Sequence, residues 1–319
     1  MSTPVAQPGP ERRAIFQPGG FSRHEGPTLP EAERLRRLTG VFLGGLFRGA
    51  LAKLGAAAFF LPAVGVGIYF VVRGVVNVEA FAVPHAGQTQ FLLDNMSLLF
   101  GLNLAWLLLV SAARVAPLIA RDAWHGALLL YFSRPVHRSH YLFARCAAPA
   151  LAGTVLLLLP ALLLLVVHLA TFGVQLGGML LQGWLATFFW LGAGLALTLA
   201  SASAAVAVSL VALGCSVVVR NPSGAPLLFG GGILGSVAVS WVLQAAWGRD
   251  TAARAFDLHH ALRSVATLAL APLSSEAVPR FALVDAAVGA SLWAVLAAGA
   301  WWLLQRFLAD PPLGKGRAG

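Results

Sequence analysis

The chain has 319 residues, of which 58% are hydrophobic and only 11% are charged, and its mean hydropathy is +0.79. In an average soluble domain about a quarter of the residues are charged, so this composition excludes an ordinary water-soluble globular protein. The composition therefore predicts an all-α, polytopic membrane protein.

The N-terminal part of the chain is unlike the rest. Residues 1–30 are rich in proline, glycine and charge, which predicts a disordered cytoplasmic tail. Residues 31–49 then place Leu35, Leu38 and Phe42 along one helical face with arginines elsewhere, which predicts an amphipathic helix lying on the inner membrane surface. The alternative is a plain cytoplasmic extension of the first membrane span.

Apolar runs near the ~20 residues needed to cross a bilayer recur along the chain. We count six of them, at residues 50–72, 96–117, 146–168, 188–213, 224–246 and 281–305. They predict a six-span transmembrane domain over 50–308, followed by a cytoplasmic tail at 309–319.

The fourth span allows two arrangements, because a continuous helix over 176–219 would be roughly twice as long as the hydrocarbon core is thick. One arrangement has an interfacial segment, "QLGGMLLQGW", leading into a single span. The other has two spans joined by a turn near "SASAAVAVS". Since that turn would contain no proline, glycine or asparagine, we favour the single span.

Lysines and arginines are distributed unevenly between the two sides of the proposed domain. With six spans, 17 of the 22 lie on the side that holds the N-terminal tail, the 118–145 segment and the C-terminal tail. The positive-inside rule then places both termini in the cytoplasm, with the chain in a bacterial inner membrane. A seven-span arrangement also gives 17, because Arg220 and the three C-terminal cations exchange sides with the four arginines of the 249–280 loop. Charge therefore fixes the first half of the topology only.

Two other motifs could indicate a metal site or a phosphate-binding loop. Asp257 with His259 and His260 resembles a fragment of a metal site, but adjacent histidines point to different sides of a helix or strand, which favours a solvated loop. "FGGGILGS" lacks the GK[ST] of a phosphate loop, and its Gly231 and Gly235 instead predict close helix packing. No nucleotide-binding motif occurs in the sequence, so we expect no enzymatic activity, no cofactor and no nucleic-acid partner for this chain.

A basic segment, "LIARDAWHGALLLYFSRPVHRSHYLFAR", interrupts the apolar pattern at 118–145. Arg121, Asp122 and His125 share one side of a short amphipathic helix, which Pro135 ends because it removes a backbone donor. The simplest interpretation is a cytoplasmic loop whose positive charge holds the topology and contacts anionic lipid. That interpretation explains the arginines but not the helix, the break and the tyrosines.

The segment resembles the cytoplasmic connection between the second and third spans of ABC-2 type transporter permeases. The matching positions are Ile119, Asp122, Gly126, Leu128, Phe132, Ser133, Pro135, Arg138 and Tyr141. The resemblance extends over about 31–308 in layout, but only this segment matches in specific residues.

The resemblance implies that the segment is a coupling helix, which docks into a separate ATP-binding subunit that carries the ATP and Mg²⁺. The implied contact residues are Arg121, Asp122, Trp124, His125, Leu128, Tyr131, Arg134, Pro135 and Arg138. It also implies a homodimer, or a heterodimer with a related permease, and export of a substrate. The absence of charged span linings favours a hydrophobic or amphiphilic substrate. Two alternatives are a membrane-embedded enzyme that uses the external His/Asp residues and a membrane scaffold without transport activity.

Overall fold

The computed structural model describes residues 30–76, 86–132, 137–172, 175–176, 179–180, 184–219, 221–247, 252–270 and 280–309. Within these ranges the chain is helical apart from one pair of two-residue strands. Six helical stretches are long and apolar enough to cross a membrane, which confirms the predicted all-α, six-span fold. The tails predicted at 1–30 and 309–319 lie almost wholly outside the described residues.

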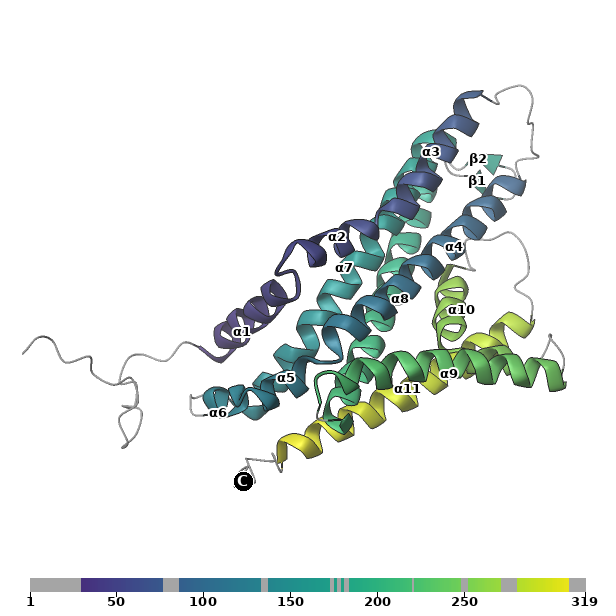
Figure 1. Ribbon diagram of the computed structural model, residues 1–319. Coiled ribbons are helices and arrows are strands. Elements are labelled where there is room, and N and C mark those ends of the chain that lie inside the picture. Colours follow the sequence, from purple (N-terminus) through teal and green to yellow (C-terminus); the bar gives the residue numbers. More distant parts are fainter. Residues whose placement is uncertain are drawn as a thin grey trace, which may run out of the picture.

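The elements are α1 (Glu31–Leu46), α2 (Ala50–Ala58), α3 (Leu61–Val76), α4 (Ala86–Val110), a π-helix (Ser111–Val115), α5 (Leu118–Trp124), α6 (Ala127–Phe132), α7 (Arg138–Phe172), β1 (Gln175–Leu176), β2 (Met179–Leu180), α8 (Trp184–Val219), α9 (Gly224–Trp247), a 3-10 helix (Ala252–Phe256), α10 (Leu258–Leu270) and α11 (Arg280–Ala309). In Figure 1, α3, α4, α7 and α8 run together, whereas α9 crosses them at another angle. Helix α1 packs beside the start of α7.

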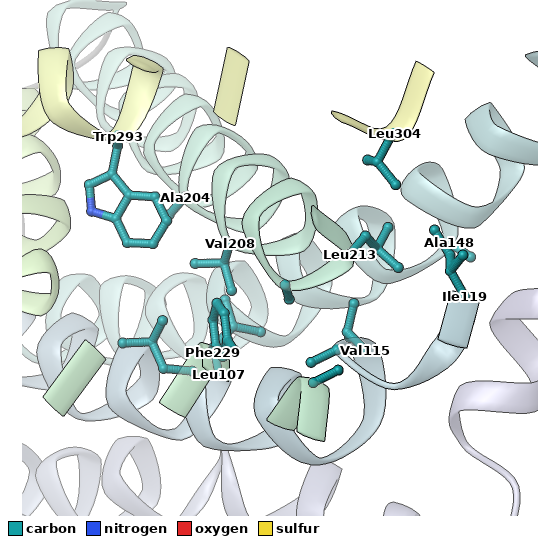
Figure 2. Packing of buried hydrophobic residues seen from close by; sticks show 14 of the residues in the cluster. Leu107, Val115, Ile119, Ala148, Ala204, Val208, Leu213, Phe229, Trp293 and Leu304 are labelled. Atoms are coloured by element: carbon teal, nitrogen blue, oxygen red, sulfur yellow. The ribbon is translucent and has the colours of Figure 1, made fainter. Parts of the chain in front are cut away.

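The main hydrophobic core lies where α4, α7, α8, α9 and α11 meet, and Figure 2 shows part of it. Small residues let the central helices approach closely: a Cβ atom added at Gly153 of α7 would lie 3.0 Å from the Cβ of Ala205 on α8. A second apolar cluster joins α3, α4, α7 and α8 around Leu99 and Leu164. These contacts hold the four helices together as one bundle.

The N-terminal region is more broken than the sequence predicts. The amphipathic helix predicted at 31–49 ends at Leu46, and the chain turns at Gly49, whose φ of +100° suits a residue without a Cβ atom. Its apolar face is directed inward, with Phe42 buried. The prediction of one continuous helix up to residue 49 is therefore wrong by about one turn.

The first span, predicted as one helix over 50–72, consists of α2 and α3 with a break at Phe59–Phe60. Pro62 lies in the first turn of α3. Because proline has no backbone N–H and its ring clashes with the preceding turn, it fits the start of a helix but not its interior. Pro62 is a sign of this break that the prediction of one helix over 50–72 did not use.

The second and third spans are longer than predicted. The span predicted at 96–117 comprises most of α4 and then a π-helical turn, marked by the bond from Ala116 N–H to the Ser111 carbonyl at 2.9 Å. The span predicted at 146–168 lies inside α7, which already begins at Arg138. The basic stretch before residue 146 is therefore the first part of the membrane helix rather than a loop leading to it.

Over 184–219 the chain forms one helix, α8, with no turn at "SASAAVAVS", which confirms the choice of a single span. The preceding "QLGGMLLQGW" contains β1 and β2, which pair antiparallel, and its predicted place at the membrane interface stays a prediction. Helix α9 matches the predicted 224–246 span within one residue, and α11 extends the predicted 281–305 span at both ends.

The loop predicted before the last span contains a helix that the sequence interpretation missed. Helix α10 packs against α4, α8 and α11. A Cβ atom added at Gly289 of α11 would lie 2.7 Å from the Cβ of Ala261, so α10 and α11 are in close contact. The prediction of a solvated loop here is wrong, because one face of α10 is apolar and buried, including Ala261 and Leu262.

Candidate functional site

The 118–132 segment folds as two short helices rather than the single one predicted. Pro117 precedes α5, and its carbonyl accepts a bond from Arg121 N–H at 2.9 Å. Helix α5 ends at Trp124 because Gly126 adopts a φ of +68°, a left-handed conformation that favours glycine. The chain therefore changes direction after about two turns of helix, and α6 begins at Ala127.

The inner side of α5 carries a buried ion pair. The Asp122 carboxylate contacts the Arg145 guanidinium of α7, and it also accepts a hydrogen bond from the Tyr141 hydroxyl at 2.6 Å. Tyr141 is fully buried, and the Arg145 and Asp122 side chains are only 9% and 13% exposed. Such a pair fixes geometry, because either charge left alone at this depth would be strongly unfavourable.

Aromatic rings enclose this ion pair. The Arg145 guanidinium lies 3.8 Å from the centre of the Phe42 ring, which brings α1 into the same contact. The Phe42 ring packs edge-on against Tyr131 and Tyr141, with centroids 5.9 Å away in each case. Burial, followed by the nearby Asp122 charge, raises the pKa of Tyr131, so its hydroxyl stays protonated. We call Phe42, Asp122, Tyr131, Tyr141 and Arg145 the Asp122 cluster.

Further hydrogen bonds tie this region to the rest of the bundle. The Ala120 N–H of α5 donates to the Ser216 hydroxyl of α8 at 2.7 Å. Arg138, at the start of α7, donates to the Leu308 carbonyl at the end of α11 at 2.7 Å. His140 of α7 lies 2.5 Å from the Glu31 carboxylate of α1. The two short helices are thus held by α1, α7 and α8, while α7 is also joined to α11.

The predicted contact residues divide into an outward and an inward group. Arg121, Trp124 and His125 are exposed, Trp124 to 59%, and we call these three residues the outer face of α5. Leu128 is buried, and Tyr131 is partly buried.

Four contact residues remain, and the structure describes two of them. Asp122 belongs to the inward group, because its carboxylate is engaged by Tyr141 and Arg145. Arg138 is exposed, although its side chain bonds to the end of α11. Arg134 and Pro135 lie outside the described residues.

The sequence interpretation missed Phe42, Arg145 and Ser216 as members of this region. One signal was present: Asp122 is the single carboxylate in a segment with four arginines, next to a membrane. A lone acid in such a place requires a cationic partner, although the sequence does not say which arginine supplies it.

The residues of the alternative enzyme site have structural contacts. The Asp257 side chain caps α10, accepting bonds from the N–H groups of His259 and His260 at 3.0 and 3.2 Å. The His259 ring bonds the Gly101 carbonyl at 2.9 Å, whereas the His260 ring lies 3.7 Å from Asp285. The two rings thus point to different helices, as predicted. In the described part of the chain, no three histidine, cysteine or acidic residues are grouped as a metal site would require.

Gly231 and Gly235 of α9 do not make the close packing predicted for them. A Cβ atom added at either residue would have no neighbouring atom within 4 Å in the described parts of the chain. Leu227 and Leu234 on the same helix are 76% and 72% exposed. This face of α9 is consequently open in the monomer.

Comparison of the chain with protein-family models gives no match, and a search of curated proteins gives none either.

Proposed function

We propose that the chain is the membrane-spanning subunit of an ABC-2 type transporter and that a separate ATP-binding cassette subunit drives it. The observation that supports this function best is the two-sided character of α5. Its outer face, Arg121, Trp124 and His125, is exposed, while its inner side is bound to two other helices, α7 and α8. A protruding helix that is rigidly joined to long membrane helices is suited to receive a force from a partner and to pass it on.

In this proposal the residues of the segment have two roles. Trp124, with Arg121 and His125 beside it, contacts the ATP-binding subunit, since exposed tryptophan and arginine are the residue types that most often dominate binding. Asp122 acts as a positioning residue, because its ion pair and hydrogen bond connect α5 to α7. Movement of α5 on ATP binding would therefore displace α7 directly, and α8 through Ser216.

We also propose the membrane in which the chain lies, its dimer contact and its substrate. The chain lies in a bacterial inner membrane with both termini and α5 in the cytoplasm, and α1 rests on the inner membrane surface. Two permease subunits pair, and the open glycine face of α9 is the proposed contact. ATP and Mg²⁺ are held by the partner, and the exported substrate is hydrophobic or amphiphilic.

The first experiment isolates the tagged protein from its own membranes in mild detergent and identifies the proteins bound to it. We expect an ATP-binding cassette protein to co-purify with vanadate-sensitive ATP hydrolysis. Trp124→Ala should weaken its binding roughly thirtyfold, since truncation of a central tryptophan typically costs about 2 kcal/mol. Trp302→Ala is the matched control, because Trp302 is 56% exposed but lies on α11.

Two results would contradict the proposal. One is a protein that purifies without any ATPase under conditions that preserve other membrane complexes. The other is equal binding of the ATPase by the Trp124→Ala and Trp302→Ala variants, because the outer face of α5 would then not be the contact.

A further inference from the structure

A cavity of about 330 Å³ lies between the α1–α2 junction, the end of α4 with its π-helix, and α7. Its volume is within the range of about 300 to 1,000 Å³ typical of small-molecule sites. Helix α7 contributes Pro149, Ala152, Gly153 and Leu156 to its lining, and α2 contributes Ala52, Gly55 and Ala56. Because most of these side chains are short, the two helices leave space between them.

Three features of the fold maintain this space: the π-helix, the end of α2 and a tryptophan hydrogen bond. The π-helix at Ser111–Val115 widens α4 where it borders the cavity, and π-helical turns are frequent at functional sites. The break after α2 ends that helix at the cavity, and no described residue of α3 lines it. Trp106 spans the gap, donating from its ring N–H to the Gly55 carbonyl at 2.9 Å. The cavity therefore belongs to the fold and does not depend on one flexible side chain.

The lining is apolar except for Ser111 and Arg114. The Arg114 side chain is partly buried, and it has no ion pair or hydrogen bond with any residue that the structure describes. A cation beside an apolar space is stabilised when an anion from outside the chain pairs with it.

Two further cations directly follow residues that line the cavity. Arg48 is exposed and directly follows the lining residue Phe47. Lys53 is exposed and follows the lining residue Ala52, about 100° further round α2. No acidic residue lines the cavity. An apolar space bordered by three cations is complementary to a molecule with a hydrocarbon chain and an anionic head.

We propose that this cavity binds an anionic phospholipid of the surrounding leaflet, with an acyl chain between α2 and α7 and the phosphate group beside Arg114. Arg48 and Lys53 attract the net negative head group, so an anionic phospholipid is preferred over a zwitterionic one. The site lies within one chain and requires neither an ATPase nor transport. Its failure would therefore leave the proposed transport function untouched, and the reverse also holds.

The test reconstitutes the whole protein in phosphatidylcholine nanodiscs and adds a trace of photoactivatable lipid. Three probes carry the same diazirine-labelled chain: phosphatidylglycerol, phosphatidylcholine and a free fatty acid. After illumination, cross-links are mapped by mass spectrometry. We expect phosphatidylglycerol to label residues that line the cavity roughly tenfold more than phosphatidylcholine does, and unlabelled phosphatidylglycerol to compete.

Two pairs of variants make the result specific. Ala56→Phe fills the cavity and should abolish its labelling, whereas Ala57→Phe, on the exposed side of the same helix, should not. Arg114→Gln should remove the preference for phosphatidylglycerol, whereas Arg36→Gln, at an exposed position of α1, should keep it.

If Ala56→Phe does not fold, the comparison of Arg114→Gln with Arg36→Gln still tests the proposal. Equal labelling by phosphatidylglycerol and phosphatidylcholine in the unaltered protein would overturn the proposal. So would stronger labelling by the free fatty acid, or a preference that persists in Arg114→Gln.

Discussion

At the scale of single residues, Asp122 has the most consequential position in the described chain. Its carboxylate is the point where α5 meets α7, and through the Arg145 guanidinium it also reaches Phe42 of α1. Replacing a buried ion pair by apolar residues of similar size is often harmless, but removing one partner is not. The cluster is therefore best regarded as a device that fixes the orientation of α5.

Removal of one member of this ion pair should lower the stability of the protein. Asp122→Ala should lower the free energy of unfolding by about 3 kcal/mol, because the Arg145 charge stays buried without its partner. Adding Arg145→Met should restore a large part of the loss. The measurement is unfolding by sodium dodecyl sulfate in mild detergent micelles.

The neighbouring Arg121→Gln is the control for this prediction, since Arg121 is exposed and its replacement should change stability by no more than about 0.5 kcal/mol. Equal losses in Asp122→Ala and Arg121→Gln would mean that the ion pair contributes nothing to holding α5.

The candidate site could be predicted from the sequence in part. The family resemblance located the segment and marked Trp124 and His125, because a local motif depends on neighbouring residues. Phe42 could not be assigned to the site, since its contact with Arg145 depends on how α1 packs against α7, about a hundred positions later. Asp122 was expected to face a partner, but an amphipathic pattern does not show which side of a short helix is covered.

At the scale of elements, hydrophobicity predicts where helices cross the membrane but not where they are interrupted. Six apolar runs were sufficient to place six helices. The π-helix after Val110 lies within continuous apolar sequence, whereas the break at Phe59–Phe60 is marked by the nearby Pro62, which hydrophobicity does not register. Helix α10 was missed because its arginine and histidines resembled a solvated loop, although these side chains lie against α4 and α11.

The contact of α10 with α11 leads to a second prediction. Gly289→Ala should destabilise the protein by about 1 to 3 kcal/mol, because the new methyl group would overlap Ala261, including its backbone at 2.9 Å. Gly299→Ala is the matched control in the same helix, since no atom lies within 4 Å of that position in the described residues. Thermal unfolding in detergent measures both, and an unchanged midpoint for Gly289→Ala would contradict the close contact.

At the scale of the whole molecule, the unbroken α8 removes the ambiguity that charge alone left. With α8 as one span, six helices are candidates for crossing the membrane, and an even number places both ends of the described chain on the same side. We propose that this side is the cytoplasm, in agreement with the positive-inside rule.

Sidedness is tested by cysteine labelling in spheroplasts. In a variant with Cys146 and Cys215 replaced by alanine, Phe256→Cys should react with a membrane-impermeant maleimide from outside. Ser223→Cys, between α8 and α9, should react only after the membrane is permeabilised. Both positions are exposed in the monomer, so access depends on the side of the membrane rather than on burial. Labelling of Ser223→Cys from outside, with Phe256→Cys reacting only after permeabilisation, would contradict this topology.

The lengths of α7 and α8 have a mechanical consequence. With 35 and 36 residues, these helices measure about 50 Å, against about 30 Å for the hydrocarbon core, so they extend well beyond it. A helix of this length that moves as a rigid rod turns around a point inside the bilayer. If such a helix turns by about 10° around its midpoint, each tip moves by about 4 Å in opposite directions. A small push on the Asp122 cluster would thus be matched by a comparable displacement at the far surface of the membrane.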